Sequence, residues 1–152
     1  MKKAKANWKG ILSVVALIAA LGMSAGALIR VTKNEKTKEL HSYSYSIGAV
    51  TDEGKLDSED KTSITSDKLQ VKDLVSIEIE EDAEVQVFVH YYNEDGDFLS
   101  TAEVVAGEEL AEAPEGAETF RVEIVPTDDD DGKITAFEKG DYAGKVTVTL
   151  KK

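Results

Sequence analysis

The sequence predicts an all-β domain, an antiparallel β-sandwich, preceded by one N-terminal transmembrane helix. One observation is an uncharged apolar stretch near the N-terminus; another is the alternation of apolar and polar residues through most of the remaining chain. Turn residues recur about every ten residues between the alternating stretches, as in all-β domains. The expected parts are a cytoplasmic basic tail at 1–9, a transmembrane segment at 10–30, a linker at 31–38 and an extracytoplasmic β-sandwich at 39–152.

The N-terminal stretch has the features of a membrane segment. Residues 10–29 carry no charge and would span roughly 30 Å as a helix, the thickness of the hydrocarbon layer. Four lysines precede the stretch and favour the cytoplasmic side, so we expect a single-pass protein of the cell membrane with its C-terminal domain outside. An uncleaved signal anchor and a signal peptide cleaved near Ala27 are both open, and the apolar Leu28 and Ile29 before Arg30 favour the anchor.

Gly22 and Gly26 form a GxxxG pair within this stretch. Such a pair lets two membrane helices approach closely, which would give a homodimer. Small residues are also frequent in membrane helices that do not pair, and here they serve the cleavage interpretation as well.

The charge and the composition exclude several classes of function. The chain has a net charge of −12 and no cysteine. Because residues 1–30 contain only basic charges, residues 31–152 carry a net charge of −17. A domain this acidic is repelled by phosphate backbones, so nucleic-acid binding is not expected. The absence of cysteine excludes disulfides, thiolate nucleophiles and cysteine-ligated zinc.

Seven stretches have the composition or the alternation of β-strands. They are residues 41–50, 62–71, 74–80, 84–93, 98–105, 119–126 and 145–150. A helical turn or two is expected only around Ile134–Tyr142, where it would plug one end of the sandwich. Alternation assigns one face of each of four strands to the core. The predicted core residues are Val75, Ile77, Ile79, Val85, Val87, Val89, Phe120, Val122, Ile124, Val146, Val148 and Leu150.

Residues 70–125 resemble the jelly-roll modules of bacterial surface and phage proteins, many of which are galactose-binding or carbohydrate-binding domains. The matching residues are Tyr91, Tyr92, Gly96, Phe98, Leu99, Ser100, Pro114, Gly116, Ala117 and Arg121. The whole layout is also similar to small, N-terminally anchored Gram-positive proteins of unassigned function. The resemblance implies a sandwich of the jelly-roll type and, more distantly, sugar binding and a structural calcium ion.

The stretch PTDDDDGKITAFE at residues 126–138 raises the question of calcium. If Gly132 is the sixth residue of a twelve-residue calcium loop, then Asp129, Asp131 and Glu138 occupy ligand positions. Thr127 then stands at the first position, where an aspartate is usual, and the stretch follows a strand instead of a helix. An acidic turn is therefore the favoured interpretation, with no cofactor, and a structural calcium ion is the alternative.

Two expected strands carry the candidate ligand-binding residues. Phe88, His90 and Tyr92 share one face of the strand at 84–93, and Arg121 and Glu123 point out of the strand at 119–126. If the two strands are neighbours, the five side chains form one surface, where rings and polar groups suit a sugar or a peptide. The favoured alternative is that Phe88 packs under a loop and Arg121 pairs with a glutamate of a neighbouring strand.

The residues together predict a non-catalytic binding module at the bacterial cell surface, with a carbohydrate or a peptide as ligand. Neither His41 nor His90 lies in a nucleophile motif, so an enzyme is not expected. Alternatives are a structural or interaction subunit of an envelope complex, and a secreted module after cleavage.

Overall fold

A computed structural model describes residues 36–128 and 132–152. The expected basic tail, the expected membrane segment with Gly22, Gly26 and Ala27, and the metal-ligand candidates Asp129 and Asp131 lie outside the described residues. Residues Thr37–Lys152 form one compact unit. Within the described ranges, no helix is both long enough and apolar enough to cross a membrane.

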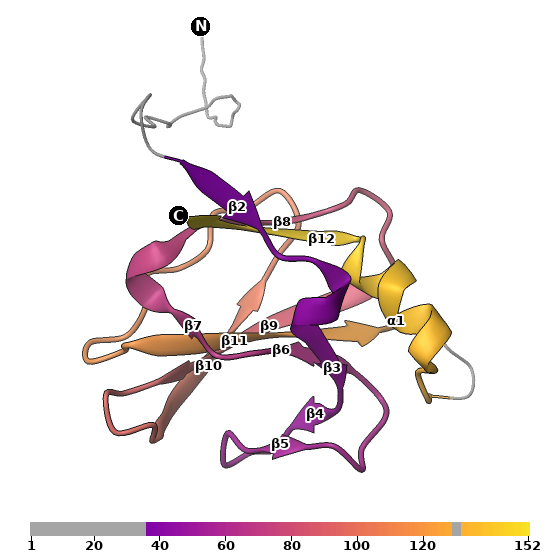
Figure 1. The fold of residues 1–152 in the computed structure, drawn as a ribbon, viewed down its shortest axis with the longest axis horizontal. Coiled ribbons are helices and arrows are strands. Elements are labelled where there is room, and N and C mark those ends of the chain that lie inside the picture. Colours follow the sequence, from indigo (N-terminus) through magenta and orange to yellow (C-terminus); the bar gives the residue numbers. More distant parts are fainter. Residues whose placement is uncertain (1–35, 129–131) are drawn as a thin grey trace, which may run out of the picture. The chain divides into compact units, whose positions relative to one another are not determined.

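A six-stranded antiparallel sheet forms the centre of the domain (Figure 1). Its strands follow the order β10-β9-β11-β6-β3, and β7 pairs with one end of β11. Their bounds are β3 (Tyr45–Ile47), β6 (Ile64–Ser66), β7 (Leu69–Gln70), β9 (Val85–Tyr92), β10 (Phe98–Val104) and β11 (Thr119–Pro126). Strands β9 and β11 pair along their full length of eight residues each, so they form the longest strand pair of the sheet.

Two smaller sheets lie on opposite sides of this one (Figure 1). The three-stranded sheet has the order β2-β12-β8, and the two-stranded sheet is the hairpin β4-β5. Their bounds are β2 (Thr37–Glu39), β8 (Leu74–Ile79), β12 (Val146–Lys151), β4 (Ala49–Val50) and β5 (Leu56–Asp57). Thr37 and Lys38, which the sequence analysis assigned to the linker, already pair with β12.

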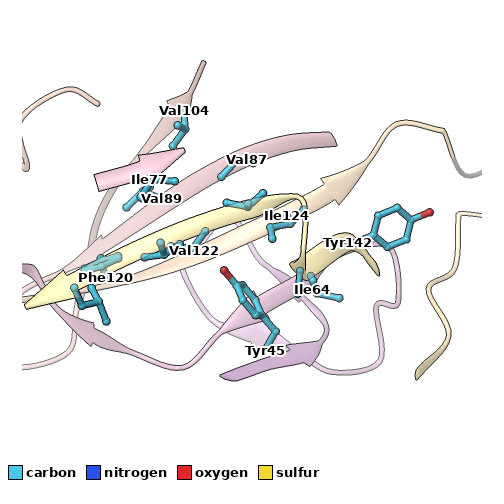
Figure 2. Packing of buried hydrophobic residues seen from close by; sticks show 14 of the residues in the cluster. Tyr45, Ile64, Ile77, Val87, Val89, Val104, Phe120, Val122, Ile124 and Tyr142 are labelled. Atoms are coloured by element: carbon cyan, nitrogen blue, oxygen red, sulfur yellow. The ribbon is translucent and has the colours of Figure 1, made fainter. Parts of the chain in front are cut away.

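The hydrophobic core lies between the six-stranded and the three-stranded sheets. The first sheet contributes five fully buried side chains, as the alternation predicts: Val87, Val89, Phe120, Val122 and Ile124 (Figure 2). The second sheet contributes the predicted Ile77, Val146, Val148 and Leu150, and Ile79 and Val85 are half-buried against the cluster. Antiparallel sheets that enclose one core confirm the all-β, sandwich-like fold class; the jelly-roll type stays a prediction.

The prediction of Val75 as a core residue is wrong, because a β-bulge shifts the alternation at the start of β8. Thr149 pairs with Ser76 and Leu150 pairs with Leu74, so β8 has one extra residue, Val75, at this point. A bulged strand bends and reverses its inside–outside pattern beyond the extra residue. Val75 is therefore 45% exposed, and Leu74 packs against the core instead.

One short helix packs beside the sheets, close to its predicted position. Helix α1 spans Ala136–Ala143 and contacts β3, β11 and β12 (Figure 1). Ile134 and Tyr142 are buried in the core cluster at this end of the sandwich. The Nζ atom of Lys139 donates to the backbone oxygen of Tyr45 at 2.8 Å, which ties the helix to β3.

Candidate functional site

The strand register brings the five candidate ligand-binding residues onto one face of the six-stranded sheet. Phe88 pairs with Glu123 and His90 pairs with Arg121 across β9 and β11, and Tyr92 lies two residues further along β9. Side chains of directly opposed residues point to the same side of a sheet. The condition that the sequence analysis set, that the two strands are neighbours, is therefore met.

Most of this face is not open, because the β4–β5 hairpin covers it. His90 is 5% exposed, Tyr92 2% and Glu123 6%. The hydroxyl of Tyr92 donates to the backbone oxygen of Gly54, in the turn of the hairpin, at 2.7 Å. The backbone N–H of Val50 donates to Oε1 of Glu123 at 3.1 Å. Three of the five predicted surface residues, His90, Tyr92 and Glu123, are therefore buried beneath the chain's own hairpin, and a ligand has no access to them.

A buried polar network centres on Glu123. Nε2 of His90 lies 2.7 Å from Oε2 of Glu123, and the hydroxyl of Ser63 donates to Oε1 at 2.6 Å. Nδ1 of His90 lies 2.9 Å from the hydroxyl of Thr101. Burial alone would raise the pKa of Glu123, but the hydrogen bonds from His90, Ser63 and Val50 outweigh it and lower the pKa. The carboxylate is therefore held charged and fully bonded, as a buried charge must be.

The hairpin is also fixed to β6 and β10. The backbone oxygen of Gly48 accepts from the hydroxyl of Thr65 at 2.7 Å and from that of Ser63 at 3.3 Å. At the other end of the hairpin, Gly54 has a φ of +80°, and a Cβ there would lie 2.5 Å from the side chain of Phe98. Only glycine allows this close approach, so the position has both a conformational and a steric requirement.

Arg121 is half-buried and acts as a tie between strands. Its Nη1 donates to the backbone oxygen of Ser66 at 2.7 Å. Beside it, Nζ of Lys68 lies 4.3 Å from the centre of the Tyr92 ring, within the range of a cation–π contact. Burial raises the pKa of the Tyr92 hydroxyl, so this group stays protonated and donates to the hairpin.

A narrower part of the face remains accessible beyond the hairpin, around Phe88. Phe88 is half-buried, while Gln86, Thr101 and Glu103 are exposed. Glu103 and Thr101 are the cross-strand partners of Phe88 and His90 on β10. We call these four residues, Gln86, Phe88, Thr101 and Glu103, the Phe88 strip. It is the open remainder of the predicted binding surface.

The third candidate metal ligand, Glu138, lies in the first turn of α1. The hydroxyl of Thr135 accepts from the backbone N–H of Glu138 at 3.2 Å and donates to the Glu138 carboxylate at 2.8 Å. Thr135 is thus the N-cap of the helix; the T-x-x-E spacing is that of a capping box, but here the Glu138 carboxylate accepts from the Thr135 hydroxyl. No cluster of three or more acidic or histidine side chains suited to a metal ion occurs within the described ranges.

Sequence reasoning missed Ser63, Thr101 and Gly54 as partners of the candidate site. The signal for Ser63 and Thr65 is present, because they flank Ile64 in TSITS and must point to the face opposite the core. Gly54 appears in the sequence only as a turn residue, and its contact with Phe98 joins positions far apart in the chain. Comparisons with protein-family models, curated proteins and solved structures gave no match, and none points to a catalytic family.

Proposed function

We propose that this chain is a membrane-anchored, extracytoplasmic and non-catalytic module that binds carbohydrate through the Phe88 strip. The observation that carries the proposal is the strand pairing that places a half-buried aromatic ring beside three exposed polar side chains. An aromatic ring stacks on the C–H face of a sugar, and amide, hydroxyl and carboxylate groups bind its hydroxyls.

The rigid surroundings of the strip support a binding role. The strip lies on β9 and β10, which pair with each other, and β9 also pairs with β11 along its full length. The buried network beneath the hairpin fixes His90, the neighbour of Phe88 on this face. A site on paired strands loses little conformational entropy when it binds a ligand, which favours affinity at a shallow surface.

The strip is tested by a glycan array with the full chain in detergent and with two variants. Phe88→Ala removes the stacking ring, and we expect about tenfold weaker binding, because an aromatic contact contributes up to about 1.5 kcal/mol beyond the area that it buries. Leu99→Ala is the matched control: Leu99 is 37% exposed but lies at the β10 bulge, outside the strip. Circular dichroism checks that both variants fold.

Two results would count against carbohydrate binding at this site. One is the absence of binding to cell-wall and host polysaccharides by the wild-type chain. The other is binding that Phe88→Ala and Leu99→Ala reduce equally. Binding of peptides without any glycan binding would assign the strip to the peptide alternative.

The proposed location is supported by the lysines before an uncharged stretch that is long enough to cross a bilayer. Protease added to intact cells is expected to remove the domain and spare the basic tail. The N-terminal residue of the mature protein distinguishes an anchored module from one released by cleavage near Ala27. An intact chain that is free in the cytosol would contradict the export proposal.

A further inference from the structure

Among the described residues, the two larger sheets have five strands with an unpaired side, β2, β3, β7, β8 and β10, and all but β10 are short, covered or irregular; β7 has only two residues. Strands β2 and β3 have three residues each, and α1 lies against β3. Strand β8 is interrupted by its bulge at Val75. Strand β10 has seven residues and forms one margin of the six-stranded sheet (Figure 1). Its own bulge lies at Leu99, near its start, so Ser100–Val104 pair with β9 in regular register.

The outer side of β10 has no described hydrogen-bond partner. Within residues 36–128 and 132–152, the hydrogen bonds of the β10 backbone are those of its ladder with β9. In an antiparallel pair, every second residue of an edge strand directs its N–H and C=O away from the sheet. These groups form a ready-made template for one more strand.

The charge of the chain segment that contains β10 selects the kind of strand that fits. Residues 93–118 contain no lysine, arginine or histidine. The segment carries nine exposed acidic residues: Glu94, Asp95, Asp97, Glu103, Glu108, Glu109, Glu112, Glu115 and Glu118. Edge strands are commonly protected from pairing by lysine, and β10 lacks that protection. A second copy of the chain would bring two such acidic segments together, and their mutual repulsion disfavours pairing between two copies.

We propose that β10 is a docking edge for an extended, lysine- or arginine-rich segment of a partner protein, which adds to the sheet as an extra strand. Backbone hydrogen bonds to the open edge supply affinity, and the side chains that alternate along the added strand supply selectivity. The partner side chains on the Phe88 side lie beside Thr101 and Glu103, so a basic residue is favoured opposite Glu103. The docking edge shares Thr101 and Glu103 with the Phe88 strip, but it binds through the backbone of β10, whereas the carbohydrate proposal rests on stacking against the Phe88 ring.

The test uses a nine-residue peptide of alternating lysine and valine, with blocked ends, and the full chain in detergent. We expect measurable binding by calorimetry that weakens as salt is raised. Hydrogen exchange should show new protection of the backbone amides of residues 98–104. A second peptide of identical sequence is N-methylated at every second residue, which removes one edge of donors but keeps the charge. We expect it to bind at least about tenfold more weakly.

A matched pair of protein variants locates the site. Glu103→Lys is expected to weaken binding of the unmodified peptide by about fivefold, since a like charge replaces a cross-strand partner. Glu78→Lys makes the same charge change on β8, in the other sheet, and should leave the affinity within about twofold. The proposal is overturned if the peptide does not bind at millimolar concentration, if N-methylation has no effect, or if protection appears away from β10.

Discussion

His90 and Glu123 form a buried pair in which Nε2 lies 2.7 Å from Oε2, beneath a hairpin of the same chain. Because a carboxylate only accepts hydrogen bonds, Nε2 carries the proton, and Nδ1 faces the hydroxyl of Thr101. The second carboxylate oxygen accepts from Ser63 and from the backbone of Val50. The pair therefore joins β9, β10 and β11 of the large sheet to the β4–β5 hairpin. Loss of the pair should loosen the three strands and the hairpin alike.

Acid should destabilise the domain through Glu123. The pKa of this carboxyl is lowered below its ordinary value of 4.5, so it contributes stability above that pH and loses it as the pH falls through the folded-state pKa. We expect the free energy of unfolding of Glu123→Gln, measured with urea, to fall less steeply than that of the wild type below about pH 5. Glu103→Gln, at an exposed position, should keep the wild-type slope; equal slopes for all three proteins would contradict the prediction.

At neutral pH, Glu123→Ala should lower the free energy of unfolding by about 3 kcal/mol, because it leaves the partners of a buried charge unsatisfied. Glu123→Gln keeps the shape and most of the hydrogen bonds, so it should cost clearly less. Urea unfolding at pH 7 measures both values. A smaller loss for the alanine variant than for the glutamine variant would show that the network does not stabilise the hairpin.

Removal of the hydroxyl by Tyr→Phe should have opposite effects on the free energy of unfolding at two tyrosines, Tyr45 and Tyr92. The hydroxyl of Tyr45 is buried and has no hydrogen-bond partner among the described residues, and Figure 2 shows its ring pointing into the core. Tyr45→Phe removes an unsatisfied polar group and should raise the free energy of unfolding by about 1 kcal/mol. Tyr92→Phe removes the bond to Gly54 and should lower it by about 1 kcal/mol. Thermal and urea unfolding check both signs, and a loss at Tyr45 would contradict the first.

Alternation in the sequence predicted the inward face of the core strands, because burial selects every second residue. It failed at Val75, since a bulge adds one residue and leaves no clear mark in a run such as LVSI. It also placed Phe88, His90 and Tyr92 correctly on one face but left open what covers that face. The cover depends on contacts such as that of Tyr92 with Gly54, which lie 38 residues apart, and local patterns do not encode such contacts.

The N-cap at Thr135 should stabilise α1 without any metal ion. Thr135→Ala removes the N-cap and should lower the free energy of unfolding by about 1 kcal/mol, whereas Thr135→Ser should retain most of it. Because the Glu138 carboxylate already accepts from Thr135, we expect calcium, and then chelator, to leave the thermal midpoint unchanged. A midpoint that rises with calcium and returns with chelator would favour the calcium alternative for residues 126–138.

The contact of Gly54 with Phe98 gives a sharp test of how closely the hairpin is docked. Gly54 and Gly107 have nearly the same left-handed backbone, with φ of +80° and +82°. A Cβ at Gly54 would lie 2.5 Å from Phe98, whereas a Cβ at Gly107 meets no atom within 4 Å. Gly107→Ala should therefore cost only the backbone strain of about 1 kcal/mol, and Gly54→Ala should cost about 3 kcal/mol or more, because the clash adds to the same strain. Urea unfolding of the two variants measures the difference, and equal costs would mean that the hairpin does not press on Phe98.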